Sequence, residues 1–291
     1  MTFEDSLLVM ADEEPFALYG LASYQLLDEL VELLLVSDES HGVESTLDSF
    51  MKTKRAQGQL PMGAFGVLEF ERHVEQAQAL VEPLKVLCRD QAEDTEVNMQ
   101  RFIFGSDKPV HLQGWINQHY QAGLIRYRVG RIRGQDYLAA WIDHLIMAVM
   151  GASCPTHLIG YDRKAGVKHL IFDEIDNVTQ ATDWLDELLC LYMDGMNEPL
   201  PYFPGTALAG LEAGINRQGE WVEDVDKSIK KMAEVFAGNS FMQIPGEGSN
   251  PYIVRIWPEW SESLAQQLRQ CGLNILHRPR FRARESESLQ K

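Results

Sequence analysis

Residues 110–130 contain two runs in which apolar and polar residues alternate, joined by a short polar connection. Alternation with a period of two places every second side chain on the same face, which is typical of β-strands. The pattern predicts strands over 110–117 and 124–132 with a turn between them. A third alternating run, 97–104, precedes them and extends the hairpin to an antiparallel meander. The chain is therefore restricted to folds that contain a sheet.

Segments with helical periodicity lie on both sides of this meander. Apolar residues recur every three or four positions in segments 19–36, 47–57, 67–89, 135–150, 178–194, 227–237 and 260–270. A second hairpin is predicted from 157–161 and 168–173. This order favours an α/β fold in which a mixed sheet is flanked by helices. We assign residues 1–95 to an N-terminal helical part and residues 96–291 to the α/β core with its C-terminal helices.

Charge is distributed unevenly along a chain whose net charge is −17. Residues 1–50 carry twelve acidic residues and no Lys or Arg, whereas residues 101–134 carry six basic residues and one acid. Such an acidic chain should not bind nucleic acid promiscuously, but a local basic segment can still hold phosphate. Two interpretations stay open for the arginines of 101–134: they bind phosphate, or they solvate an exposed sheet face. For the four arginines within 278–284, the alternatives are phosphate or partner binding and a frayed, solvated end.

Several classes of protein are disfavoured by what the sequence lacks. It has no apolar run of about 18 residues, and its first residues are acidic, so we expect neither membrane association nor a signal peptide. Four scattered cysteines indicate free thiols and a cytoplasmic protein. Because no phosphate-loop motif and no zinc-type histidine spacing occur, we expect no cofactor and no metal.

The polar residues of the first hairpin determine which chemistry it can support. In metal-dependent nucleases with such a hairpin, the first strand ends in Asp and the second carries an acid-x-Lys triplet. Here the first strand ends in Asn117, and the triplet is Arg126-Tyr127-Arg128. Mg²⁺ requires anionic oxygen ligands, and two guanidinium groups would repel it. We therefore predict a catalytically degenerate nuclease fold, with Asn117, Arg126 and Arg128 at the degenerate positions and no catalytic residues.

Basic and aromatic residues around this hairpin are candidates for DNA binding. Arginines can pair with phosphates, and exposed aromatic rings can stack on unpaired bases. The candidates are Arg126, Arg128, Arg131, Arg133, Trp115 and Tyr127. Aromatic residues of a half-buried sheet also commonly belong to a core or an interface. We expect partner surfaces at residues 33–36 and 199–204.

The sequence resembles the C-terminal domain of the gamma (RecC) subunits of exodeoxyribonuclease V, the RecBCD helicase-nucleases. The matching segments run in order through nearly the whole chain, and members of that family are several times longer, so the chain looks like an excised or separately encoded domain. The segments include EEPFALYGL at 13–21, LPMGAFG at 60–66, GLIRYR at 123–128, GEG at 246–248 and RIW at 255–257.

This resemblance implies a restriction-endonuclease-like (PD-(D/E)XK-type) fold in which the catalytic set is lost. It also implies a role in DNA double-strand-break repair and recombination. The expected partners are a RecB-like helicase-nuclease chain, a RecD-like helicase chain and DNA at a duplex end or fork, where a projecting pin separates the strands. This pin is not assigned to residues.

Two alternatives from other classes remain. An active metal-dependent nuclease could use displaced acids, because Asp162-Arg163-Lys164 is a literal acid-x-Lys triplet and Asp173 follows it. A solvated turn is the simpler interpretation of that triplet. A pure protein–protein adaptor that never touches DNA is favoured by the net charge of −17.

Overall fold

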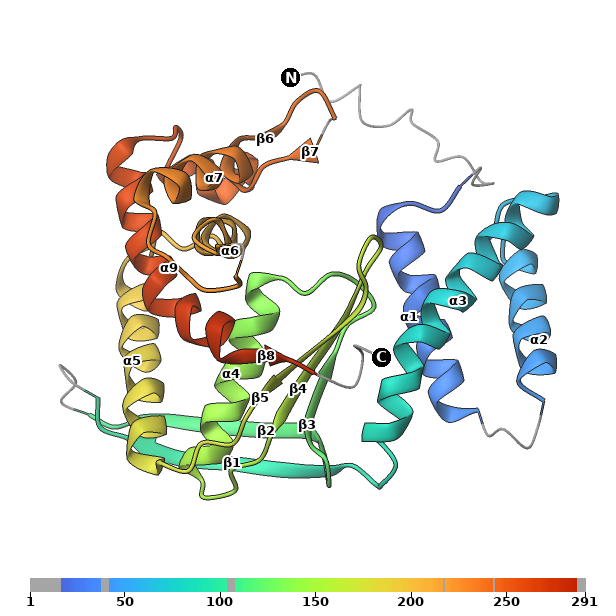
Figure 1. Cartoon of the computed structure of the whole chain (residues 1–291), viewed down its shortest axis with the longest axis horizontal. Helices are drawn as coiled ribbons and strands as arrows, with labels where there is room; N and C mark the ends of the chain where they lie inside the picture. The colour runs from blue at the N-terminus through green and yellow to red at the C-terminus, as the bar shows by residue number, and fades with distance from the viewer. Residues whose placement is uncertain (1–16, 38–41, 104–107, 217, 243, 287–291) are drawn as a thin grey trace. The chain divides into compact units, whose positions relative to one another are not determined.

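The computed structural model describes residues 17–37, 42–103, 108–216, 218–242 and 244–286 (Figure 1). The chain divides into two units. One comprises residues 1–89, 127–131 and 159–168 and is called the helical unit below. The other comprises residues 90–126, 132–158 and 169–291 and is called the sheet unit. The boundary after residue 95 that the sequence suggests remains a prediction.

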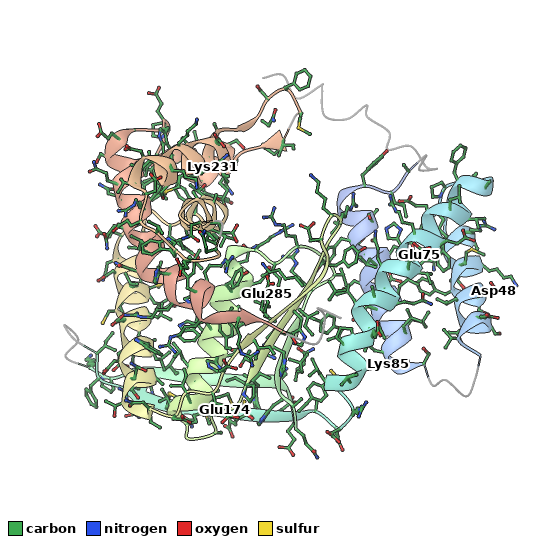
Figure 2. All side chains as sticks on the ribbon, in the orientation of Figure 1. Asp48, Glu75, Lys85, Glu174, Lys231 and Glu285 are labelled. Carbon is green, nitrogen blue, oxygen red and sulfur yellow. The ribbon has the colours of Figure 1, made fainter. Side chains whose placement is uncertain are left out.

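Three helices make up most of the helical unit. They are α1 (Gly20–Val36), α2 (Val43–Ala56) and α3 (Gly63–Leu87), which confirms the predicted helices within a few residues of each end. α1 packs against α3 through fully buried leucines such as Leu30 and Leu80. Charged side chains of α2 and α3, including Asp48, Glu75 and Lys85, stand out from these helices (Figure 2). The sequence also suggests an extended lead-in over residues 1–18, and residues 1–16 of it lie outside the described residues.

Six strands form a mixed sheet in the order β1-β2-β3-β4-β5-β8. β1 pairs with β2, β2 with β3, and β5 with β8 in antiparallel fashion. Backbone bonds join Leu124 to Pro155 and Arg128 to Ile159, so the residue numbers rise together and β3 runs parallel to β4. The strands are β1 (Glu93–Arg101), β2 (Val110–Tyr120), β3 (Gly123–Tyr127), β4 (Thr156–Asp162), β5 (Gly166–Phe172) and β8 (Ala283–Glu285).

The predicted meander and second hairpin are therefore present, with two corrections. β3 ends at Tyr127 rather than at residue 132, because the chain leaves the strand before α4 (Gly134–Val149) begins. α4 connects β3 to β4, and such a crossover is what joins parallel neighbours. The last strand, β8, was not predicted, because three residues are too few to show a period.

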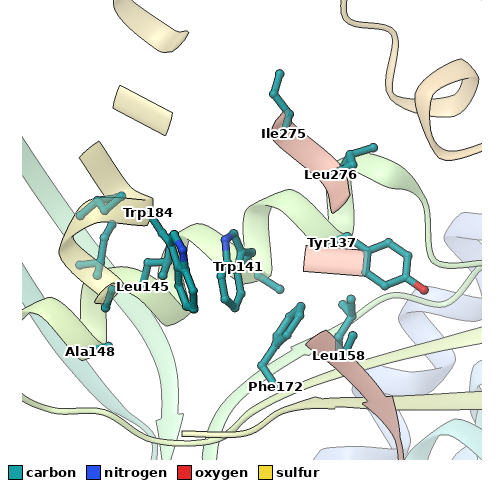
Figure 3. Close-up of a cluster of buried hydrophobic side chains, with 14 of the residues drawn as sticks. Tyr137, Trp141, Leu145, Ala148, Leu158, Phe172, Trp184, Ile275 and Leu276 are labelled. Carbon is teal, nitrogen blue, oxygen red and sulfur yellow. The ribbon is translucent and has the colours of Figure 1, made fainter. Parts of the chain in front are cut away.

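The core of the sheet unit is built around one tryptophan of α4. Trp141 is fully buried, and its ring lies 5.4 Å from that of Phe172 and 5.7 Å from that of Trp184 (Figure 3). Trp184 comes from α5 (Val178–Asn197), and Phe172 ends β5. Aromatic pairs at these separations add stability beyond the area they bury. The apolar periodicity of residues 135–150 and 178–194 thus identified the two helices that form this core.

The C-terminal part of the sheet unit departs most from the sequence-based prediction. Helix α6 begins at Pro204, in a segment for which the sequence analysis predicted no helix. Proline is well suited to the first position of a helix. Helix α9 continues to Arg282, although the predicted helix ended at residue 270. Gly272 lies inside α9, and a Cβ there would meet the Ala207 Cβ at 3.0 Å. The remaining elements are α6 (Pro204–Ala213), α7 (Val225–Ala237), β6 (Gly238–Asn239), β7 (Ile244–Pro245), η2 (Glu247–Ser249), α8 (Pro251–Ile256) and α9 (Glu262–Arg282).

Glu247 caps α6 from a distant loop. Its carboxylate accepts hydrogen bonds from the backbone N–H groups of Gly205 (3.0 Å) and Thr206 (2.6 Å). These amides lie in the first turn, where helical N–H groups lack an intrahelical partner and the helix dipole favours negative charge. We expect Glu247→Ala to lower the free energy of unfolding by about 2 kcal/mol. Urea denaturation measures this loss, and the exposed Glu259→Ala should change it by less than about 0.5 kcal/mol; equal effects of both variants would contradict the capping role.

Candidate functional site

The β2–β3 hairpin carries a bulge at the position where the sequence analysis placed a degenerate catalytic residue. Glu93 pairs with His119 and Thr95 with Ile116, so two steps along β1 correspond to three steps along β2. The extra residue falls at Asn117–Gln118, and Gln118 adopts a left-handed conformation with φ of 58°. A bulge changes the direction of the side chains around it. Asn117 therefore lies inside β2 at an irregular position, rather than at the end of the strand as predicted.

Arg126 on β3 is the residue for which the sequence analysis predicted the degenerate position of a metal-binding acid. Its Nε and Nη2 each lie 2.8 Å from Oδ2 of Asp143 on α4. Its Nη1 donates to the backbone carbonyl of Asn117 at 2.8 Å. Asn117 and Arg126 are thus brought together, but through the main chain of Asn117. The guanidinium supplies the positive charge beside the Asp143 carboxylate, and charge-assisted bonds of this kind are the stronger ones.

Arg128 and Tyr127 belong to the helical unit. The guanidinium carbon of Arg128 lies 5.7 Å from the ring centroid of Tyr24 on α1, at a separation typical of cation–π contacts. Burial raises the pKa of Tyr127, and the carboxylates of Asp28 and Glu32 raise it further. Tyr127 is half-buried.

Three of the six candidates for DNA binding have exposed side chains. Trp115 on β2 is 64% exposed and stands opposite Glu96 of β1. The side chain of Arg131 is 72% exposed, with its Nε 3.8 Å from Oδ2 of Asp162. Arg133 precedes α4; its backbone N–H donates to Asp136 at 2.7 Å, and its side chain is exposed. Trp115 and Arg133 belong to the sheet unit and Arg131 to the helical unit.

Two arginines of the basic segment 101–134 form ion pairs within the protein. Arg101 forms a two-pronged ion pair with Asp186, at 2.9 and 2.7 Å, as Arg126 does with Asp143. These two arginines are neutralised by acids of α5 and α4. Arg101 and Arg126 therefore do not merely solvate an exposed sheet face. Because Arg131 and Arg133 are exposed, they are the better candidates for binding phosphate.

Asp162 and Asp173, the acids that an active nuclease could use instead, already have hydrogen-bond partners. Oδ1 of Asp162 accepts the backbone N–H groups of Lys164 (2.8 Å) and Ala165 (3.2 Å) at the β4–β5 turn, and these bonds lower its pKa. Asp173 of the sheet unit pairs with Arg284, whose Nε lies 2.8 Å from both carboxylate oxygens, and this pair lowers its pKa. Within the described ranges, no three His, Cys, Asp or Glu side chains gather in a way that could hold a metal ion.

The four arginines within 278–284, for which the sequence allows phosphate or partner binding or a frayed, solvated end, instead interact with residues of the sheet unit. Arg280 pairs with Glu212 at 3.0 Å, Arg284 with Asp173, and Arg278 with Glu187. Arg282 lies over the Trp184 ring, 4.3 Å from its centroid. These side chains hold α9 and β8 against the other elements of the sheet unit, so their charges contribute to the stability of the fold.

The expected partner surface at residues 199–204 needs a correction. Phe203 is 3% exposed and packs among Phe236 and Trp257, and Tyr202 is half-buried with a pKa raised by burial. These aromatic side chains therefore belong to the core of the sheet unit. In the other expected surface, residues 33–36, Leu34 is buried but Val36 is exposed.

A cavity in the helical unit was missed by sequence reasoning. It measures about 420 Å³ and is lined by residues of α1, α3, the segment 129–131 and the β4–β5 turn. Because its walls come from four separate stretches of the chain, no pattern within a single segment predicts the cavity. The only signal was the triplet at 162–164, which the sequence analysis treated as a possible metal site.

Comparisons with known proteins agree on one family. A family model described as the RecC C-terminal domain matches residues 1–215. The chain is similar to the RecBCD enzyme subunit RecC of Escherichia coli (strain K12), with 27% identity over 283 residues, which cover 94% of this chain and 23% of that protein. The corresponding subunit of Buchnera aphidicola subsp. Schizaphis graminum is 22% identical over 222 residues, 74% of this chain and 19% of that protein. The chain thus spans less than a quarter of the length of these curated relatives.

No helix in the described part of the chain combines the length and the apolar character needed to cross a membrane.

Proposed function

The chain belongs to the RecC C-terminal domain family, and from this premise we propose that it acts as a non-catalytic, nuclease-like domain in a RecBCD-type DNA repair complex. In this role it holds the RecB-like and RecD-like chains and contacts DNA at the unwinding fork. The restriction-endonuclease-like ancestry of the sheet is part of the proposal. The proposed role starts from the family membership, and the proposed absence of catalysis rests on the residues of the β2–β3 hairpin.

The ion pair between Arg126 and Asp143 is the observation that carries the non-catalytic role. Metal-dependent phosphodiester cleavage needs carboxylates that bind a cation and orient the attacking water. At β3 the cation is instead a guanidinium, held by Asp143 and by the carbonyl of Asn117. A divalent ion at this position would meet a fixed positive charge at short range. The hairpin is thus suited to structural work and unsuited to metal binding.

Contact with DNA is assigned to the exposed members of the candidate set. Trp115 offers a flat ring that can stack on an unpaired base, and Arg133 offers a charge for phosphate. Arg131 does the same in the helical unit. These groups lie on a chain with net charge −17, so binding should be local and sensitive to salt.

Assembly with other chains is supported by apolar side chains that this chain does not cover. Phe241 is 96% exposed, and Met242 and Ile244 of the same β6–β7 segment are also exposed. In the helical unit, Phe65 and Leu68 of α3 are exposed one turn apart. Exposed apolar groups gathered in this way commonly mark protein–protein interfaces.

One experiment with two readouts tests the proposal. The purified chain is incubated with an end-labelled DNA fork in Mg²⁺ or Mn²⁺, and both cleavage and binding are measured over a range of salt concentrations. We expect no cleavage above that of an Asp162→Ala/Asp173→Ala control. We expect binding that weakens about tenfold in Trp115→Ala, because one stacked base contributes about 1–3 kcal/mol. Arg133→Ala should reduce the salt dependence by about one phosphate contact.

The matched controls are Trp115→Phe, which keeps an aromatic face, and Arg255→Ala, which removes an exposed arginine of α8. Both should bind DNA almost as the wild type does. Metal-dependent cleavage that disappears in the Asp162→Ala/Asp173→Ala control would establish the active nuclease instead. If the chain binds no DNA at any salt concentration but still assembles with a RecB-like chain, the pure adaptor is correct.

A further inference from the structure

The cavity of the helical unit combines features of a ligand site that the proposed function does not use. Its volume of about 420 Å³ falls within the range of small-molecule pockets. We call it the Tyr24 pocket after the residue that α1 contributes. The residues that carry the argument are Tyr24, Arg131, Tyr161, Asp162, Arg163 and Lys164.

The charge of the Tyr24 pocket is opposite to that of the chain as a whole. Arg131, Arg163 and Lys164 line it, and Asp162 is the one acid among the residues that line it. The Asp162 carboxylate is already satisfied by the backbone N–H groups of Lys164 and Ala165. Nε of Arg131 lies 3.8 Å from Oδ2 of Asp162, but three cations against one acid still leave the lining with an excess of positive charge. A concave site with such an excess concentrates anions, even on an acidic protein.

The two cations of the turn are available to a ligand. Within the described part of the chain, neither Arg163 nor the side-chain amine of Lys164 forms an ion pair, and both side chains are exposed. This differs from the arginines of α9 and β8, which pair with acids of the sheet unit. The turn that carries them donates two backbone hydrogen bonds to Oδ1 of Asp162, at 2.8 and 3.2 Å.

Aromatic walls distinguish this pocket from a simple anion site. Tyr24 and Tyr161 both line it and both are half-buried. The backbone N–H of Tyr161 donates to the carbonyl of Gly130 at 3.0 Å, and Arg128 lies over the Tyr24 ring at 5.7 Å. A free phosphate gains nothing from two tyrosine rings. A ligand with both a flat ring and a phosphate can use the rings and the cations together.

We propose that the Tyr24 pocket binds one nucleotide of a single-stranded nucleic acid, with the phosphate on Arg163, Lys164 and Arg131 and the base against Tyr24 and Tyr161. The proposal rests on the DNA contact of the proposed function and adds a specific subsite to it. Base–aromatic stacking tolerates any sequence, so the pocket retains a strand without reading it. Its role would be to hold a strand after separation.

The test uses the purified chain and a fluorescein-labelled oligodeoxythymidylate, with binding followed by fluorescence anisotropy. We expect Arg163→Ala/Lys164→Ala to weaken single-strand binding about tenfold, since two phosphate-pairing charges are lost. The matched control is Lys227→Ala/Lys230→Ala, which removes two exposed charges from α7 and should change binding less than about twofold. Tyr161→Leu should weaken binding about tenfold and Tyr161→Phe should not, because phenylalanine retains the stacking face.

A second measurement locates the bound strand directly. Ultraviolet cross-linking with 5-iododeoxyuridine in the oligonucleotide should label peptides that contain Tyr24 or Tyr161. Labelling only at Trp115, or unchanged binding by both pocket variants while Trp115→Ala is impaired, would overturn the pocket and leave the proposed function intact. Equal competition by inorganic phosphate and by thymidine monophosphate would show a plain anion site and also overturn the proposal. Absence of any DNA binding by the wild type would overturn both.

Discussion

Replacing Gly123 with alanine should destabilise the sheet unit by about 3 kcal/mol or more. Gly123 has φ of +117°, a conformation that L side chains rarely adopt, and a Cβ there would lie 2.1 Å from the carbonyl oxygen of Pro155. That oxygen accepts the backbone N–H of Leu124 at 2.9 Å, the first bond of the parallel β3–β4 pair. The clash is with backbone, so it can be relieved only by moving the two strands apart.

Gly114→Ala provides the matched control for this prediction. Gly114 lies in the same β2–β3 hairpin, and a Cβ there would meet nothing within 4 Å. We expect its alanine variant to remain within about 0.5 kcal/mol of the wild type. Urea denaturation followed by tryptophan fluorescence measures both, because all six tryptophans belong to the sheet unit. Equal stability of the two variants would show that β3 and β4 do not approach as described.

The parts of the fold that the sequence predicts are those with a long, local period. Helices α1, α3, α4 and α5 were found because each buries one apolar stripe, and such a stripe is visible in a single segment. Helix α6 was missed because its apolar residues show almost no one-sided pattern: it is buried on most sides between α7 and α9. Strand β8 was missed because its position depends on pairing with β5, more than 100 residues earlier.

The candidate site also has features that the sequence predicts and features that it does not reveal. The sequence predicts that Arg126 cannot bind a metal, since this follows from its own chemistry. It does not reveal that Asp143 neutralises Arg126, because that acid lies on a different element and resembles any polar residue of a helix. The arginines of α9 and β8 illustrate the same limit: Arg284 and Asp173 are 111 residues apart. Charge spacing along a chain cannot identify partners brought together by tertiary packing.

Lowering the pH from 7 to 5 should reduce the stability of the sheet unit by several kcal/mol. Burial lowers the pKa of His144 and of His169, each to about 4, and also lowers that of His157. The unfolded chain, with histidine pKa near 6.5, therefore takes up protons first as the pH falls. The stabilisation that each such histidine contributes is fully present above about pH 6.5 and is lost progressively as the pH falls to about 4. For a histidine whose pKa is lowered to about 4, about 2 kcal/mol is lost at pH 5.

The hydrogen bonds of the His157–His169 pair explain why it must remain neutral. His157 Nε2 lies 3.1 Å from the carbonyl oxygen of Ala122, so this nitrogen carries the proton and donates. His157 Nδ1 must then accept from His169 Nε2, at 2.8 Å. A proton added to His157 would place two N–H groups against each other. A proton added to His169 would enter at Nδ1, a buried nitrogen with no hydrogen-bond partner among the described residues.

Two asparagine variants distinguish the loss of stability caused by protonation of a buried histidine from the loss caused by other titrating groups. His144 is 1% exposed, with its Nδ1 2.9 Å from Thr156 Oγ1, so His144→Asn should be less stable than the wild type at pH 7. Its further loss between pH 7 and pH 5 should be smaller than that of the wild type by about 2 kcal/mol, because the group that titrates is gone. His111→Asn, which removes an exposed histidine of β2, is the matched control for the substitution itself. Carboxylates with lowered pKa, such as Asp162 and Asp173, stay ionised throughout this window. An unaltered pH dependence in His144→Asn would therefore mean that His144 is not held neutral in the folded protein.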